Sequence, residues 1–159
     1  MSLSETTRIF LSIAGISAQS FNRAGQPRED MDTATFHLCV GWVAGLFGAV
    51  AGGAIGLFFH RDSWAGGYTS FRRRMLRLGH VSFFGIGFLN LFFGLSLEPL
   101  ALQGNPTHVA SWAFLIAVVL MPATCFLTAW NPVFRHLFPL PVLAILIGIA
   151  SVIVGVLTS

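Results

Sequence analysis

Four long apolar runs occupy most of this chain of 159 residues. They are Phe36–Phe59, Met75–Leu97, Val109–Trp130 and Phe138–Leu157. Each has about 20 residues or more, and a helix that rises about 1.5 Å per residue crosses a hydrocarbon core of about 30 Å at that length. Backbone in lipid must satisfy its own hydrogen bonds, so each run is predicted to be a helix.

The composition agrees with this prediction. Hydrophobic residues make up 55% of the chain and charged residues only 9%, whereas a soluble domain has about 25% charged residues. The connections are short, so successive helices are expected to pack as neighbours of opposite direction. The predicted fold is therefore all-α: a polytopic membrane protein with an antiparallel bundle of four transmembrane helices over residues 35–159 and an extramembrane segment over residues 1–34.

The segment before the first run carries a short apolar pattern. Ile9, Phe10, Ile13 and Ile16 recur at helical spacing, but the stretch is too short to span a bilayer. We expect a short N-terminal interfacial helix. A secretory signal with residues 9–18 as its apolar region is the alternative, and the acidic Glu5 in its n-region argues against it.

The basic residues predict the orientation. The region Arg61–Arg77 holds Arg61, Arg72, Arg73, Arg74 and Arg77 against Asp62 alone. By the positive-inside rule this connection is expected to be cytoplasmic. The next connection has Glu98 and no basic residue, and the third has Arg135. The prediction is a multi-pass protein of a bacterial-type inner (cytoplasmic) membrane, with both termini outside.

Glycines follow one side of the first run. Gly41, Gly45, Gly48, Gly52 and Gly56 cluster on about a quarter of the helix circumference at 3.6 residues per turn. Small residues let helices approach closely in lipid, so this glycine zipper is predicted to pack against another helix. The alternative is a slot for a flat cofactor such as haem.

The second run carries the most suggestive face. His80, Phe84, Gly87, Leu91, Gly94 and Glu98 share it, and Asn90 lies about 80° further around the helix. His80 can ligate haem b or contact a pigment, with Gly87 and Gly94 leaving room for the ring. The alternative is a histidine that reaches the interface or bonds a backbone carbonyl. Asn90 and Glu98 are candidate polar groups of the membrane interior, where such groups are often functional.

The histidines divide by depth. His37 and His108 are expected at the outer surface, and His60, His80 and His136 toward the inner one. His80 is the first candidate ligand, and His37 and His108 are the next. Because only His80 lies a turn inside a run, a complete haem site within the chain is not expected. One axial ligand shared with a partner protein is the alternative that stays open.

The arginines Arg72, Arg73, Arg74 and Arg77 can bind anionic lipid headgroups or an acidic partner. The alternative is that they serve membrane topology alone. No catalytic residue is predicted, because the sequence holds no GxSxG or HExxH motif and no lysine. Its two cysteines, Cys39 and Cys125, form no CxxC motif, so neither a zinc site nor a covalently attached haem is expected.

These features predict a small integral-membrane accessory subunit of a larger complex, of the respiratory or photosynthetic electron-transport kind. Its expected partners are the lipid bilayer, with its anionic lipids, and other integral membrane subunits, and not nucleic acid. One alternative is a haem b electron-transfer subunit. The other is a small membrane enzyme or transporter with a polar pocket around Asn90.

Overall fold

The fold is that of a computed structural model, which describes residues 29–158, with side chains from residue 33 onward. Four long helices make up this part: α3 (Glu29–Phe58), α4 (Phe71–Ser96), α5 (Asn105–Trp130) and α6 (Pro139–Thr158). Short 3-10 helices η1 (Trp64–Gly66) and η2 (Pro132–Leu137) lie in two connections. The predicted interfacial helix falls outside the described residues.

The all-helical class is confirmed, and four helices are long and apolar enough to cross a membrane. The helices α3, α4 and α5 begin before their apolar runs do, because an apolar run marks only the part suited to lipid, whereas α6 begins one residue after its run. The helix α4 begins after Ser70, whose hydroxyl accepts a hydrogen bond from the backbone N–H of Arg73. The first turn of α5 holds Pro106, where a missing N–H costs little.

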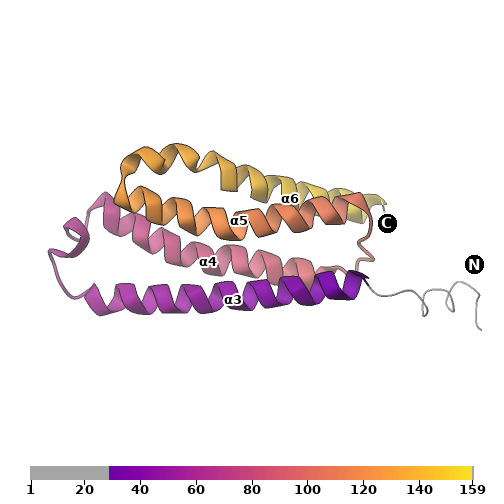
Figure 1. The fold of residues 1–159 in the computed structure, drawn as a ribbon, viewed down its shortest axis with the longest axis horizontal. Helices are drawn as coiled ribbons and strands as arrows, with labels where there is room; N and C mark the ends of the chain where they lie inside the picture. The colour runs from indigo at the N-terminus through magenta and orange to yellow at the C-terminus, as the bar shows by residue number, and fades with distance from the viewer. Residues whose placement is uncertain (1–28, 159) are drawn as a thin grey trace, which may run out of the picture.

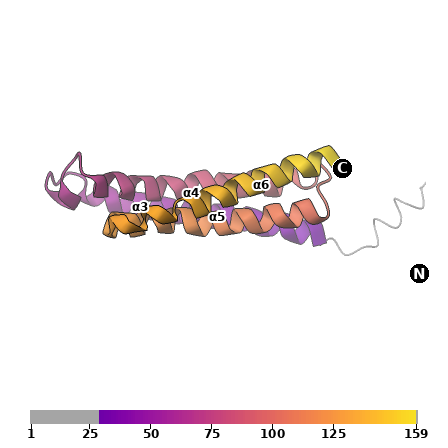
Figure 2. The ribbon, with the colours of Figure 1, turned by 90° about the horizontal axis from the view of Figure 1, so that it is seen from above.

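The helices form a row in the order of the sequence. In Figure 1, α4 lies beside α3, α5 beside α4 and α6 beside α5, and the chain turns back at each connection. Figure 2 shows α6 crossing α5 at an angle. As a result α4 and α5 bury more of their residues than α3 and α6, which form the two edges of the row.

Small residues set the contact between α3 and α4. A Cβ at Gly48 would lie 2.8 Å from the Phe84 ring, and one at Gly52 would lie 3.0 Å from His80. A Cβ at Gly41 would lie closer still to the Leu91 side chain. As the residue number rises along α3 it falls along α4, so the two helices run in opposite directions with one register over three turns.

Two apolar clusters fill the interior. Ala44, Ile86, Ala117, Val118 and Ala144 form one, with members from all four helices. The other comprises Phe93, Leu97, Leu102, Ala110 and Phe114, next to the connection between α4 and α5. The Leu102 side chain also packs over Gly155, which anchors this connection to α6.

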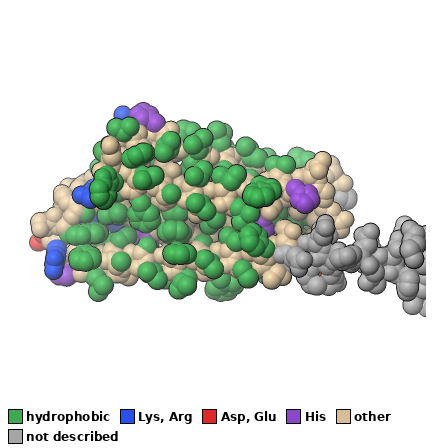
Figure 3. Space-filling model, viewed as in Figure 1, with side chains coloured by type: hydrophobic (Ala, Val, Ile, Leu, Met, Phe, Trp, Pro, Cys, Tyr) green, Lys and Arg blue, Asp and Glu red, His purple; other side chains and the backbone are tan. Residues whose placement is uncertain are grey.

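The outer surface is apolar along most of its length. Hydrophobic side chains cover the face drawn in Figure 3, and arginines gather at one end. Trp42 is 73% exposed and Trp130 82% exposed. Soluble monomers rarely expose so large a continuous apolar area. Together with the four long helices, this surface fits a multi-pass membrane protein in contact with lipid.

Candidate functional site

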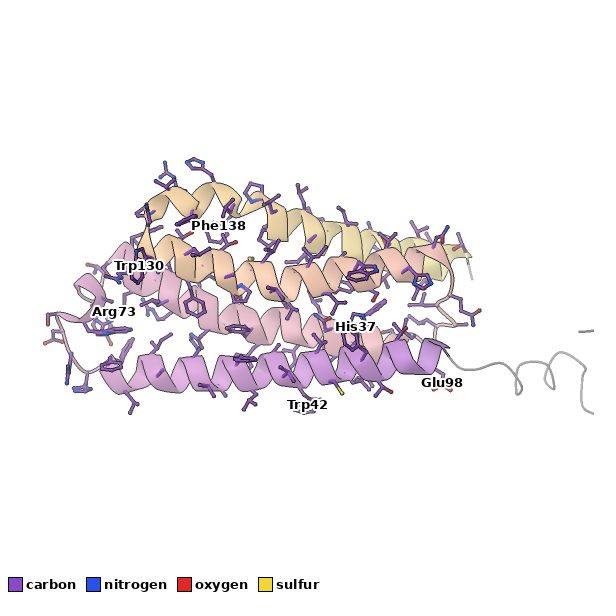
Figure 4. All side chains as sticks on the ribbon, in the orientation of Figure 1. His37, Trp42, Arg73, Glu98, Trp130 and Phe138 are labelled. Carbon is purple, nitrogen blue, oxygen red and sulfur yellow. The ribbon has the colours of Figure 1, made fainter. Side chains whose placement is uncertain are left out.

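Two buried polar side chains and one half-buried serine meet between α3, α4 and α5. The Nδ1 atom of His37 lies 2.8 Å from Oδ1 of Asn90, and its Nε2 atom lies 2.8 Å from Oγ of Ser111. His37 and Asn90 are both 0% exposed. Figure 4 shows His37 on the side of α3 that faces the other helices, with Trp42 pointing away. We call His37, Asn90 and Ser111 the polar node.

The hydrogen bonds of Asn90 determine the proton positions in the polar node. The Asn90 Nδ2 group donates to the carbonyl oxygens of Ile86 at 2.9 Å and Phe114 at 3.4 Å. Its Oδ1 atom must therefore accept, so His37 donates from Nδ1–H. In the neutral imidazole Nε2 is then an acceptor, and the Ser111 hydroxyl donates to it.

Aromatic and backbone groups enclose the polar node. The His37 ring meets the Phe93 ring edge-on at a centroid distance of 4.7 Å, and Phe93 contacts Phe114 at 5.3 Å. Gly94 lies beside the base of the His37 side chain, and an added Cβ there would lie 3.3 Å from the His37 Cβ. His37 and Asn90 are thus enclosed, Ser111 is half-buried, and both nitrogens of the His37 ring are hydrogen-bonded.

The sequence predicts His37 near the outer end of its span, and the structure adds that its side chain is fully buried against the neighbouring helices. The candidate span of α3 begins at Thr33, one turn before His37. A signal for this burial was present, because His37 lies near the sector of Gly41, Gly48 and Gly52 that faces α4. Ser111 was not singled out, because a lone serine in an apolar run carries no pattern.

His80 occupies a different place, near the other end of the contact between α3 and α4. It is half-buried, its ring rests on Gly52, and its Nδ1 atom is buried without a hydrogen-bond partner. His80 lies beside Gly52 of α3, and Gly52 is 15 residues from His37. At 1.5 Å per residue this separates the two histidines by about 22 Å along the helix.

These positions do not let His37 and His80 ligate one haem together. His37 and His80 are too far apart to reach one iron, and both nitrogens of His37 are hydrogen-bonded. The space beside Gly87 and Gly94 is filled by α3, through Ala44 and the carbonyl oxygen of Ala34. His108 is exposed. Over the described residues, no group of three or more His, Cys, Asp or Glu side chains can hold a metal.

Glu98 lies apart from the polar node. It is exposed and follows the end of α4, near the start of α3 in Figure 4. Eight residues separate it from Asn90, or about 12 Å along a helix. The structure therefore does not bring Asn90, His80 and Glu98 together in one pocket.

A second buried polar group, Arg73, lies at the opposite end of the hairpin of α3 and α4. Its guanidinium is 0% exposed and lies 4.7 Å from the Phe59 ring centroid, 5.5 Å from that of Trp64 and 4.5 Å from that of Tyr68. The Nη2 group donates to the carbonyl oxygens of Phe59 at 2.7 Å and Arg61 at 3.3 Å. Nε and Nη1 have no hydrogen-bond partner. We call these three rings the aromatic cage.

The connection folds around Arg73 for local reasons. Gly66 and Gly67 have φ of 86° and 93°, a region that glycine adopts without strain, and they turn the chain between Trp64 and Tyr68. The Ser70 hydroxyl donates to the carbonyl oxygen of Ala65 at 2.7 Å. The same Oγ caps α4, so one serine ties the cage to the helix that carries Arg73.

The other predicted site residues lie around these two features. Arg72 and Arg74 are exposed and Arg77 is half-buried. Among the glycines of α3, Gly41, Gly48 and Gly52 face α4, whereas Gly45 and Gly56 face open space. The chain was compared with family models, curated proteins and solved structures, and none of these comparisons gave a match.

Proposed function

We propose that this chain is a small, non-catalytic accessory subunit of a larger assembly in a bacterial-type inner membrane, of the electron-transport kind. The observation that supports it best is the saturation of the polar node. Both nitrogens of His37 and the whole amide of Asn90 are used to join three helices. A buried group with no free donor or acceptor is suited to holding helices together rather than to binding a substrate.

The edges of the row supply the surface for partner subunits. The helix α6 buries Pro141, Ala144, Gly148 and Gly155 toward the row. Its other side exposes large aliphatic residues, among them Leu143, Leu146 and Ile153. We place the contact with neighbouring subunits on this outward side of α6. The orientation in this proposal follows the arginines, with both termini outside and the connection at 61–77 in the cytoplasm.

The experiment is site-specific photocrosslinking in native membranes. A photoreactive amino acid at Leu146 faces outward, and one at Ala144 faces the row and serves as the control. We expect Leu146 to crosslink a distinct integral membrane protein in stoichiometric yield, and Ala144 to crosslink only within the chain. A chain that migrates as a monomer in mild detergent, with catalytic turnover of its own, would contradict the proposal.

A haem b electron-transfer subunit is the second candidate, and one observation favours it. His80 has a buried ring nitrogen with no partner, which can serve as one axial ligand if a neighbouring subunit supplies the other. A reduced-minus-oxidised spectrum of the intact complex tests this candidate. A Soret shift that His80→Ala removes and His108→Ala leaves would support it, whereas no shift in the complex would eliminate it.

A polar pocket for an enzyme or transporter has less support. Asn90 is enclosed by Phe93 and Phe114 and hydrogen-bonds to backbone carbonyls on two helices. Water that reached Asn90 would have to displace these contacts. Exchange of the Asn90 side-chain protons on the timescale of exposed amides would revive this candidate.

A further inference from the structure

The outer side of the hairpin of α3 and α4 carries a row of small residues without cover. Gly45, Gly53 and Gly56 have no atom within 4 Å of the position that a Cβ would take, and Ala49 is exposed. At 100° per residue these four positions span about 80° of the circumference of α3. They lie beside the α4 contact, on the side away from α5.

A ridge of larger side chains on α4 borders this row. Val81 and Phe88 are each 53% exposed. Seen along each helix from its N-terminus, these two residues are rotated from the α3–α4 contact line in the same direction as the small residues of α3. In a pair of helices with opposite directions, equal rotations from the contact line point to the same side. The row and the ridge therefore form a shallow apolar groove on one surface.

Arginines lie at one end of this groove. Arg74 and Arg77 share the face of Val81 and Phe88, and the register of Gly52 with His80 puts Arg77 level with Gly56. Neither arginine pairs with a carboxylate of residues 33–158. Arg73 adds a positive charge behind them, fully buried and without a carboxylate partner among those residues. An uncompensated buried charge favours a nearby anion.

The length of the groove distinguishes between occupants. From Gly56 to Gly45 it runs 11 residues, or about 16 Å along α3. This is about half of a hydrocarbon core of about 30 Å, the depth of one leaflet. A transmembrane helix of a partner would need the full thickness, whereas an acyl chain with its headgroup at the arginines needs only one leaflet.

We propose that this groove binds one anionic phospholipid, with its phosphate at Arg74 and Arg77 and an acyl chain along Gly56, Gly53, Ala49 and Gly45. The proposal requires that the chain spans a bilayer, but it does not depend on the role as a subunit. It therefore concerns the isolated chain, and its failure would leave the photocrosslinking result untouched.

The test is native mass spectrometry of the purified full-length chain released from nanodiscs that contain phosphatidylglycerol or phosphatidylcholine. We expect the wild type to retain one phosphatidylglycerol in preference to phosphatidylcholine. The double variant R74Q/R77Q should bind phosphatidylglycerol about 30-fold more weakly, since two basic contacts near the surface are lost. R135Q removes one charge from the other basic connection and is the control. Equal lipid loss in R135Q and R74Q/R77Q would overturn the proposal.

A second variant tests the acyl-chain part. Gly53→Leu puts a side chain into the groove at a position where a Cβ meets no atom within 4 Å, so the variant should fold. We expect it to lower phosphatidylglycerol retention at least tenfold, while Ala150→Leu on the exposed side of α6 leaves it unchanged. Full retention in Gly53→Leu would overturn the groove as the lipid site. Displacement of the lipid by millimolar inorganic phosphate would also overturn it, because a headgroup contact alone would then explain the binding.

Discussion

The imidazole of His37 donates from Nδ1 to Oδ1 of Asn90 over 2.8 Å, and this bond joins the first and second spans of the described chain. Both residues are fully buried, and Ser111 extends the bond to a third span. Hydrogen bonds between helices in a membrane contribute about 0.6 kcal/mol on average and up to about 1.7 kcal/mol. The polar node is thus a modest source of stability but a strict constraint on register.

Loss of either partner should destabilise the helices by a coupled amount. We expect Asn90→Leu and His37→Leu each to lower the free energy of unfolding by about 1 to 3 kcal/mol, because each leaves a buried polar group unpaired. The double variant should lose less than the sum, with a coupling of about 1 kcal/mol. The measurement is reversible unfolding in mixed micelles. If the losses of the two single variants simply added up in the double variant, the bond between His37 and Asn90 would contribute nothing. Ser111→Ala is the reference for the loss of one hydroxyl group.

Two glycines one turn apart on α3 should respond differently to the same substitution. Gly41→Ala puts a methyl group onto the Leu91 side chain and the Gly87 carbonyl oxygen, so we expect a loss of about 1 to 3 kcal/mol from overpacking. Gly45→Ala meets no atom within 4 Å, and its stability should stay within about 0.5 kcal/mol of the wild type. The same unfolding assay compares them. A larger loss in Gly45→Ala than in Gly41→Ala would show that the register of α3 and α4 differs from the one described.

Removal of the guanidinium of Arg73 should open the connection between α3 and α4. In Arg73→Ala the aromatic cage loses its centre and two carbonyl oxygens lose their donor. Limited chymotrypsin digestion of reconstituted protein should then cut after Trp64 or Tyr68 at least several times faster. Arg73→Lys keeps the charge but not the planar guanidinium, so its digestion rate should lie between those of the wild type and Arg73→Ala. Arg72→Ala removes an exposed arginine and should digest like the wild type.

Impermeant thiol labelling measures the orientation. In a background of Cys39→Ser and Cys125→Ser, the exposed positions Thr69 and Gln103 are replaced singly by cysteine. We expect Gln103→Cys to react in intact spheroplasts and Thr69→Cys only after permeabilisation, because the basic connection is expected in the cytoplasm. The reverse pattern would contradict the proposed orientation.

Local pattern was enough to predict the helices and part of their packing. Length and hydropathy identify the four spans, because lipid leaves the backbone no other structure. The glycines Gly41, Gly48 and Gly52 and the face of His80 and Phe84 can both be read from periodicity, and the structure packs them against each other. The ends of the helices were less predictable, because polar first turns are helical without being apolar.

The polar node and the aromatic cage depend on contacts that no local pattern encodes. His37 and Ser111 are 74 residues apart, and their pairing is defined only once three helices are placed together. Arg73 looks the same as Arg72 and Arg74 in the sequence. It lies seven residues before His80, on the face that meets α3, and this phase explains why it alone is buried.

The way in which the polar node joins three successive spans has a consequence for biogenesis. A nascent chain that has delivered only α3 and α4 to the membrane leaves Nε2 of His37 without its donor, since Ser111 has not yet reached the membrane. Hydrocarbon penalises such a half-bonded imidazole. Release of the first hairpin into the lipid therefore becomes more favourable once the third span arrives, and this couples insertion to the order of synthesis.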